Sequence, residues 1–275
     1  MPPSQRSGKV VAGQAGAVGL LLAAGRGERL GQEAPASGKA FLTLHGRPLL
    51  HWSLRAFEES EAITAVVVVA PPGEEERARK VAAAVGGKVQ AIVAGGAHRQ
   101  DSLGAGLDAI ADLFGADLPG EDHLVAVHDA ARPLVRPIDV TRVVYAAERR
   151  GAAILAVPVK ETVKVVGAND RIIETLNRER LWLAQTPQVA RASVLRSALA
   201  RARREGRVST DEAALLEALE IRVLVVLGDY GNLKVTTPED VILADCLLAA
   251  RESGPRESEA REPKARESKA PESKE

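Results

Sequence analysis

Residues 17–31 read AVGLLLAAGRGERLG, a short apolar run that passes directly into a glycine-rich segment. The apolar part has the length of a buried strand and stops at residues that favour turns. Gly25, Gly27 and Gly31 allow backbone conformations that other residues rarely adopt, so the loop can turn its N–H groups toward a phosphate. Arg29 adds a cation whose planar fork suits phosphate oxygens. The segment predicts a strand followed by a phosphate-binding loop.

The same loop has a second interpretation, the G-x-G-x-x-G fingerprint of dinucleotide-binding folds. That fingerprint needs its third glycine one residue before Gly31 and a helix directly after the loop. Pro35 and Gly38 interrupt residues 32–39, so a helix cannot continue there. A glycine-rich turn without any ligand is a third possibility. We favour a long phosphate loop, in which Lys39 could neutralise phosphate charge.

The composition fits a folded domain with an aliphatic core. The 275 residues are 45% hydrophobic but only 3% aromatic, enough for one well-buried α/β domain or two small ones. The 37 basic and 37 acidic residues cancel, so nothing suggests nucleic-acid binding. Cys246 is the only cysteine, which excludes an intrachain disulfide and agrees with a cytoplasmic location. No run reaches the roughly 18 apolar residues that a membrane span needs.

Strand-like and helix-like segments alternate along most of the chain. Continuous apolar runs such as AVVVVA at 65–70 are typical of strands in a parallel sheet covered on both faces. The alternation predicts an α/β domain with a doubly wound, mostly parallel (Rossmann-like) sheet and helices on both faces. We expect strands at 18–23, 65–70, 89–93, 124–127, 152–157 and 222–227, and helices at 48–59, 74–85, 102–113, 140–150, 191–205, 210–220 and from 238 onward.

Residues 158–182 interrupt this alternation. Segments 162–166 and 171–175 are β-like and flank a Gly-Ala-Asn-Asp turn, which is a hairpin signal. An isolated hairpin is only marginally stable in water. We therefore expect a β-hairpin arm that projects from the domain and packs on a partner subunit.

The two ends of the chain differ from the domain between them. Residues 1–16 are small and polar without periodicity, and residues 251–275 repeat Arg-Glu-Ser without a large apolar side chain. We expect a flexible N-terminus and a disordered charged tail around a domain at 17–250. Arg6 and Lys9 precede an apolar run, as in a signal peptide, but cleavage after that run would destroy the glycine loop. No signal peptide is expected.

Polar motifs follow two of the predicted strands, where open α/β sheets bind their ligands. GGAHRQDS occupies 95–102, and HDAARP begins at His128. Asp129 could hold Mg²⁺ directly or through water, and Arg132 could bind a phosphate or a sugar hydroxyl. We expect His128 to orient the loop. Ser102 could cap the following helix, hydrogen-bond a base, or do both.

Seven ordered blocks resemble the 2-C-methyl-D-erythritol 4-phosphate cytidylyltransferase family of the non-mevalonate isoprenoid pathway. They are AAGRGERLG (23–31), GGAHRQDSL (95–103), HDAARPLV (128–135), KETVKVV (160–166), NRERLWLAQTPQ (177–188), STDEA (209–213) and NLKVTTPED (232–240). Seven blocks in family order are more specific than one glycine motif. The resemblance implies a cytidylyltransferase that uses CTP, Mg²⁺ and a sugar-alcohol phosphate, releases pyrophosphate, and dimerises by exchanging arms.

The resemblance also implies roles for individual residues. The CTP pocket would be lined by Ala23, Ala24, Gly25, Gly27, Gly95, Ser102 and Asp129, with Gly95 and Ser102 reading cytosine. The catalytic cations would be Arg29 and Lys39 on the triphosphate and Arg178 and Lys234 on the attacking phosphate. The acceptor would be bound by Asp129, Arg132, Thr162 and Thr210, with Thr162 and Arg178 reaching in from the arm of the partner subunit. Mg²⁺ would be held mainly by the CTP phosphates, with Asp129 as a possible ligand.

One segment departs from the family's usual pattern. The family usually has a Pro-Lys-Gln step after the glycine loop, whereas here residues 36–38 separate Pro35 from Lys39. Ala40 stands where Gln is frequent. The path from Arg29 to Lys39 is therefore longer than usual, and no other lysine lies nearby to replace Lys39.

Three alternatives stay open on the sequence alone. A ribitol-phosphate cytidylyltransferase shares the glycine loop and the HDAARP-like block. An NAD-dependent dehydrogenase needs a helix at 32–39 and an acid at the end of the next strand, and neither is apparent. A nucleotide-binding module without activity is compatible with the lengthened loop.

Overall fold

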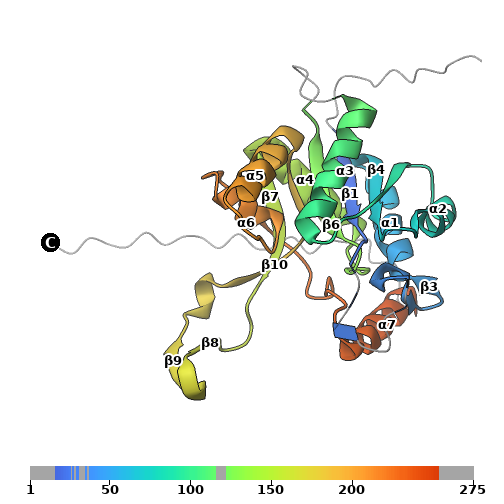
Figure 1. Ribbon diagram of the computed structural model, residues 1–275. Coiled ribbons are helices and arrows are strands. Elements are labelled where there is room, and N and C mark those ends of the chain that lie inside the picture. Colours follow the sequence, from blue (N-terminus) through green and yellow to red (C-terminus); the bar gives the residue numbers. More distant parts are fainter. Residues whose placement is uncertain are drawn as a thin grey trace, which may run out of the picture.

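The computed structural model describes residues 16–25, 27, 29–30, 35, 37–115 and 122–253. Seven strands form one central sheet in the order β11-β7-β10-β6-β1-β4-β5 (Figure 1). The strands are β1 (Ala17–Leu22), β4 (Ile63–Ala70), β5 (Val89–Ala94), β6 (Leu124–Asp129), β7 (Ala152–Pro158), β10 (Trp182–Arg191) and β11 (Leu224–Leu227). The helices are α1 (Leu49–Glu59), α2 (Glu75–Ala83), α3 (Arg99–Phe114), α4 (Pro137–Arg150), α5 (Ala192–Arg204), α6 (Glu212–Glu217) and α7 (Pro238–Ser253).

The sheet is mostly parallel, as the alternation predicted. Only β10 is antiparallel, and it runs so against both of its neighbours, β6 and β7. The sequence did not indicate this strand, which contains Pro187. The pairing of β10 with β7 is irregular between Ala184 and Gln188, and the proline, which has no N–H to donate, lies in that irregular stretch. The predicted fold class is confirmed, with one strand added.

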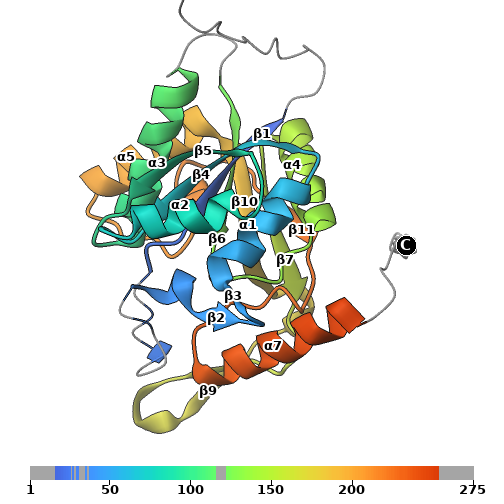
Figure 2. The same cartoon turned by 90° about the vertical axis from the view of Figure 1, so that its right-hand side faces the viewer.

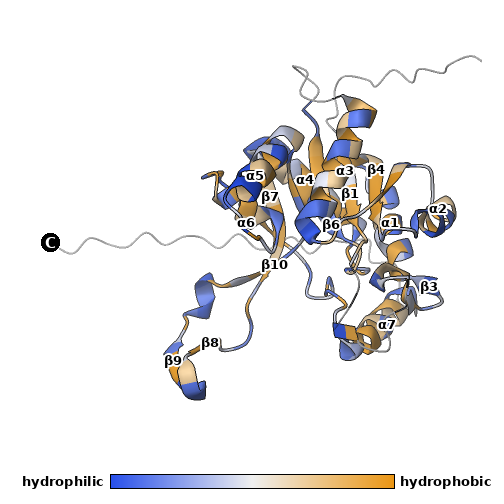
Figure 3. Cartoon of the chain, viewed as in Figure 1, coloured by the Kyte–Doolittle hydropathy of each residue, from blue (hydrophilic) through white to orange (hydrophobic). Residues whose placement is uncertain are grey.

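The side chains of β1 show why the sheet is covered on both faces. Successive side chains of a strand point to opposite faces. Leu21 belongs to an apolar cluster with side chains of α1, α2 and α4, whereas Leu20 and Leu22 belong to a cluster with α3, α5 and α6. Figure 3 shows the matching contrast between apolar central strands and the polar surfaces of α2 and α5.

A smaller apolar cluster joins α7 to the rest of the domain. Trp52, Leu30 and Leu44 pack there with Leu248 and Val235. The α7 helix lies beside the short strands β2 (Thr43–Leu44) and β3 (Arg47–Pro48), as Figure 2 shows. It begins at Pro238, as predicted, and runs past the expected domain end to Ser253. The disorder expected for 1–16 and 251–275 lies almost entirely outside the described residues and stays a prediction.

The predicted hairpin arm is present. Strands β8 (Lys164–Val166) and β9 (Ile172–Thr175) pair antiparallel with each other and join no other sheet. The arm extends away from the sheet at the end of β7 and β10 (Figure 1). Its apolar side chains are uncovered, with Ile172 62% and Ile173 70% exposed. A surface of this kind indicates an interaction site.

Candidate active site

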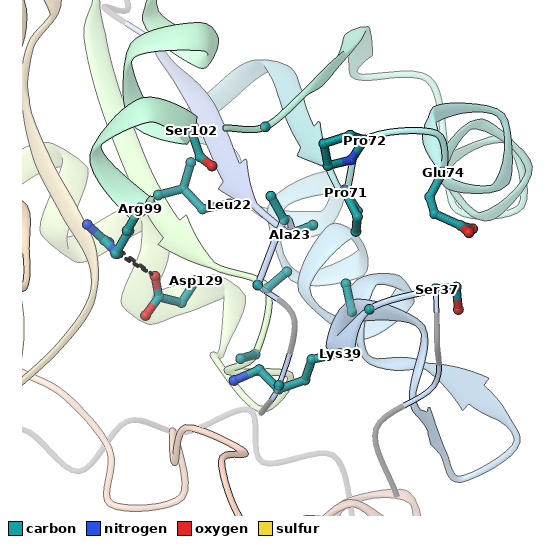
Figure 4. Close-up of a pocket in the computed structure, with 18 of the residues that line it drawn as sticks. Leu22, Ala23, Ser37, Lys39, Pro71, Pro72, Glu74, Arg99, Ser102 and Asp129 are labelled. Carbon is teal, nitrogen blue, oxygen red and sulfur yellow. Dashed lines mark hydrogen bonds and ion pairs between the residues drawn. The ribbon is translucent and has the colours of Figure 1, made fainter. Parts of the chain in front are cut away.

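A pocket of about 1290 Å³ lies at the carboxyl ends of β1, β4, β5 and β6. Loops that follow adjacent parallel strands meet at one edge of the sheet, which explains why segments distant in sequence share this wall. The site residues predicted from the sequence that line it are Ala23, Ala24, Gly25, Gly27, Arg29, Lys39, Gly95, Ser102, Asp129 and Lys234. Figure 4 shows several of these side chains around the cavity.

The long path from Arg29 to Lys39 returns to its starting point. The Lys39 N–H donates to the carbonyl of Gly25 at 3.1 Å, which closes the loop upon itself. Gly38 makes this closure possible, since its φ is +96° and a Cβ there would lie 2.9 Å from Pro71. The extra residues thus leave Lys39 beside the glycine loop. Gly31, part of the predicted phosphate loop, lies outside the described residues.

Lys39 is half-buried and lies near both cations and acids. Burial, followed by the charge of Lys234, lowers the pKa of Lys39 to about 8, and Arg29 adds to the effect. No ion pair holds the Lys39 amine within the part of the chain that the structure describes. Arg29, Lys39, Arg99 and Lys234 outnumber the two described acids that line the pocket, Glu74 and Asp129, and such an excess of positive charge favours the binding of an anion.

Asp129 ends β6 and lies between two cations. Its Oδ1 accepts from Arg99 Nη2 at 3.1 Å, and its Oδ2 is 2.6 Å from Lys234 Nζ. Burial alone would raise the pKa of Asp129, but Arg99 and Lys234 hold it well below its usual range. The carboxylate is therefore ionised at neutral pH.

His128 orients this loop, as predicted, through hydrogen bonds of both of its ring nitrogens. Burial lowers the pKa of His128 to about 4, so the ring is neutral at pH 7. Its Nε2 lies 3.2 Å from the Arg132 carbonyl, which only accepts, so Nε2 carries the proton. Nδ1 then accepts from the Thr186 hydroxyl at 2.9 Å, and Thr186 Oγ1 accepts from the Asp129 N–H at 3.1 Å. The chain of bonds fixes the backbone that carries Asp129.

The prediction that Ser102 caps a helix is wrong. The α3 helix begins at Arg99, because the Asp101 carboxylate accepts from the His98 N–H at 3.1 Å and starts it one turn earlier. Ser102 lies inside α3, where its hydroxyl donates to the His98 carbonyl and accepts from the Gly96 N–H, both at 3.3 Å. Its contact with Gly95 is close, since a Cβ on Gly95 would lie 2.8 Å from Ser102 Oγ. The expected base-reading pair is thus at the pocket wall.

Four predicted residues do not line the pocket. Arg132 donates to the backbone carbonyls of Asn232 at 2.8 Å and of Ala184 at 3.2 Å, which ties β10 to the loop before Lys234. Thr210 is exposed and precedes α6. Arg178 and Thr162 belong to the arm, where Arg178 Nη1 donates to the carbonyl of Lys160. Their proposed contacts with substrate stay predictions.

Sequence reasoning missed two charged residues in this region, Arg99 and Glu212. Arg99 lines the pocket between Asp129 and Glu212, and Glu212 is fully buried. Both lie in the blocks that carry the family resemblance, at 95–103 and 209–213. A buried carboxylate needs a cation as its partner. Nothing in the sequence, however, indicates which of the many arginines provides it.

The comparisons with known proteins agree on one family. The family model described as IspD, 2-C-methyl-D-erythritol 4-phosphate cytidylyltransferase, matches residues 17–250. The chain is 45% identical to the enzyme of that name from Pelotomaculum thermopropionicum over 235 residues, 85% of this chain and 94% of the relative. It is 42% identical to the one from Desulforamulus reducens over 236 residues, 85% and 96% of the two chains. The crystal structure of the Thermus thermophilus enzyme is similar, with a TM-score of 0.67, 36% identity, and coverage of 85% and 99%.

Proposed function

We propose a catalytic arrangement for this chain, which belongs to the 2-C-methyl-D-erythritol 4-phosphate cytidylyltransferase family. Its reaction is the CTP-dependent transfer of a cytidylyl group to 2-C-methyl-D-erythritol 4-phosphate, in the non-mevalonate isoprenoid pathway. The match over 17–250 favours this reaction over the ribitol-phosphate, dehydrogenase and inactive-module alternatives. A cytoplasmic location stays a prediction, supported by the single cysteine.

The products define what the site must do. An oxygen of the acceptor phosphate attacks the α-phosphorus of CTP, the bond between that phosphorus and the bridging oxygen breaks, and pyrophosphate leaves with the electron pair. The nucleophile is already an anion, so the reaction needs no strong general base. The obstacle is repulsion between the acceptor phosphate and the triphosphate. Preorganised cations overcome such repulsion, and this electrostatic effect is often the largest in catalysis.

Our assignment of roles rests on one observation: the same pocket is lined by Lys39, Arg29 and Lys234. Lys39 and Arg29 stabilise charge on the triphosphate as pyrophosphate leaves. Lys234, 2.6 Å from Asp129, holds the acceptor phosphate in line, which is an orientation effect. In Figure 4 the Lys39 side chain extends across the pocket toward the side on which Asp129 lies.

Mg²⁺ is the cofactor that we propose, held mainly by the phosphates of CTP. Mg²⁺ usually keeps several waters and binds one or two carboxylates together with substrate phosphates. Asp129 is the candidate carboxylate, although Arg99 and Lys234 contact its two oxygens, and within the described ranges no group of three or more His, Cys, Asp or Glu side chains could hold a metal. The ion would therefore be held mainly by CTP, with Asp129 beside it. When bound, it neutralises part of the triphosphate charge.

The reaction itself is tested directly by measuring pyrophosphate release from CTP. We expect release with Mg²⁺ and 2-C-methyl-D-erythritol 4-phosphate, and much slower release with ribitol 5-phosphate. A folded protein that turns over neither acceptor would contradict the reaction. Faster turnover of the ribitol compound would favour the alternative enzyme.

The pKa of Lys39 predicts a pH dependence of CTP use. The protonated amine carries the charge that the triphosphate needs, and this form dominates in the free enzyme below a pH of about 8. The value of kcat/KM for CTP reports groups of the enzyme before it binds CTP, so it should be near its maximum at about pH 7 and fall above about pH 8. The measurement is a pH profile at saturating acceptor.

Lys39→Arg is the control for this profile, because arginine stays protonated in proteins. Its activity at pH 7 will be lower, but the fall above pH 8 should disappear. A fall that persists unchanged in Lys39→Arg would assign the titration to another group.

We propose that the enzyme is a homodimer in which the arms are exchanged. The exposed apolar side chains of β8 and β9 support this, as does the position of Arg178 on the arm, outside the pocket wall of its own chain. No described helix is long and apolar enough to cross a membrane. Burial against a second subunit would stabilise the arm.

Subunit mixing tests the exchange of arms. Arg178→Ala and Lys39→Met should each be nearly inactive alone. After the two variants are mixed and refolded together, random pairing should restore about a quarter of the wild-type activity, because half of the dimers then contain one intact site. Sedimentation should show a dimer throughout. If mixing restores nothing although mixed dimers form, Arg178 acts within its own chain.

A further inference from the structure

We propose that Arg99 is a positioning residue that fixes Asp129, and that the buried carboxylate of Glu212 holds Arg99 in place. The proposal rests on the function proposed above and adds two residues that have no role in it so far. Arg99 opens α3 next to the glycines at 95–96, and Glu212 opens α6. Their ion pair joins the two helices directly, and Arg99 also contacts Asp129 at the end of β6.

Arg99 makes its hydrogen bonds with two protein carboxylates, those of Glu212 and Asp129. Its Nη1 and Nη2 donate to Glu212 Oε1 and Oε2 at 2.5 and 3.0 Å, as a two-pronged pair. Its Nε and Nη2 donate to Asp129 Oδ1 at 3.3 and 3.1 Å. A guanidinium has five N–H donors, and these contacts engage about four of them. Arg99 therefore lines the pocket without offering most of its donors to a ligand.

Glu212 is held rigidly enough to serve as the anchor. Asp211 caps α6 by accepting from the Ala214 N–H at 3.0 Å. Gln188 of β10 accepts from the Ala213 N–H at 2.8 Å and donates to Asp211 at 3.0 Å. The first turn of α6 is thus attached to the sheet on both sides of Glu212. A bidentate arginine–carboxylate pair on such a support has a defined direction.

The consequence for catalysis concerns the second oxygen of Asp129. Because Arg99 occupies Oδ1, the carboxylate cannot rotate freely, and Oδ2 is presented to Lys234. Lys234 is the cation that we assign to the acceptor phosphate. Arg99 and Glu212 thus determine where this cation lies before substrate arrives, as outer-shell partners determine the orientation of directly acting groups.

The test separates this positioning role from a purely structural one. Arg99→Met alone leaves Glu212 buried without its cation, so both thermal stability and kcat should fall. The double variant Arg99→Met/Glu212→Met removes both charges and keeps similar volumes, so its Tm should return toward that of the wild type. Its kcat should nevertheless stay about 10- to 100-fold below that of the wild type, because the Arg99 hydrogen bonds that orient Asp129 are lost. The KM for CTP should change by less than about threefold, because few Arg99 donors are left for a ligand.

Arg196→Met is the matched control. Arg196 also connects α5 to α3, through Asp108 at 3.2 Å and the Leu107 carbonyl at 3.2 Å, but it does not line the pocket. It should keep the wild-type kcat. Glu212→Gln provides a second variant should the double variant fold poorly: it keeps the shape, weakens the hold on Arg99, and should lower kcat with the KM for CTP unchanged.

Two results would overturn the proposal. A stable double variant with wild-type kcat would show that the ion pairs serve folding alone. A rise in the KM for CTP at unchanged kcat would show that Arg99 binds the nucleotide directly. Both are independent of the catalytic assignment of Lys39, which is tested by its own variant.

Discussion

Lys39→Met is expected to lower kcat by about a hundred- to a thousandfold, the usual effect of removing one preorganised charge from a site where charge develops. The Lys39 amine lies in the pocket, and among the described residues no acid is paired with it, so its charge is available to the triphosphate. We expect the KM for CTP to rise less than kcat falls, because Arg29 still contributes to binding. Steady-state kinetics with both substrates varied will measure the two effects.

The same variant should be at least as stable as the wild type. Burial and the neighbouring cations lower the pKa of Lys39 from 10.5 to about 8 in the folded state. A lowered lysine pKa means that folding disfavours the charged amine at every pH below about 8, and that this cost fades as pH rises toward 10.5. Removing the amine removes the cost, so the Tm at pH 7 should be equal or higher.

Lys88→Met is the control for Lys39. Lys88 is also a partly buried lysine, but its Nζ donates to the Ser60 carbonyl at 2.7 Å, away from the pocket. Its loss removes this hydrogen bond outside the pocket and should leave kcat unchanged. If Lys39→Met keeps the wild-type kcat, Lys39 is not the catalytic lysine. Another cation of the pocket would then supply the charge.

Lys234→Met should have the second largest effect, a fall in kcat of about a hundredfold together with a rise of roughly tenfold in the KM for the acceptor. Lys234 contacts Asp129 at the wall of the pocket and is the cation that we place on the attacking phosphate. The KM for CTP should change little. For Lys39→Met, by contrast, the KM for CTP is the one expected to rise. The same assay measures both variants.

Lys234→Arg tests whether charge alone is enough. Arginine keeps the charge but not the compact, strongly hydrated shape of the ammonium group, so we expect partial activity. An increase in the KM for CTP with an unchanged KM for the acceptor would contradict the assignment of Lys234 to the attacking phosphate.

The fold was predictable where local pattern and tertiary structure agree. The six-residue apolar run of β1 is buried along its whole length, as a central parallel strand requires. The strand β10 was not predictable in this way. Its sequence, WLAQTPQVAR, contains a proline and several polar residues. Several of those polar side chains find their partners in tertiary contacts, such as that of Thr186 with His128.

The pocket was predictable because glycines and charged residues directly follow its strands in the sequence. The ion pair between Arg99 and Glu212 was not predictable from the sequence. The two residues are 113 positions apart and meet only because α3 and α6 pack on the same face of the sheet. The length of the loop before Lys39 was also misleading on its own. Only the bond from Lys39 to Gly25 shows that the chain returns to the glycine loop.

The most direct test of the catalytic arrangement is a structure of the enzyme with CTP and Mg²⁺. We predict that Lys39 Nζ and the Arg29 guanidinium contact the triphosphate, that the cytosine lies between Gly95 and Ser102, and that Arg99 keeps its bonds to Asp129 and Glu212. A triphosphate bound away from Lys39, with this amine turned to solvent, would contradict the arrangement.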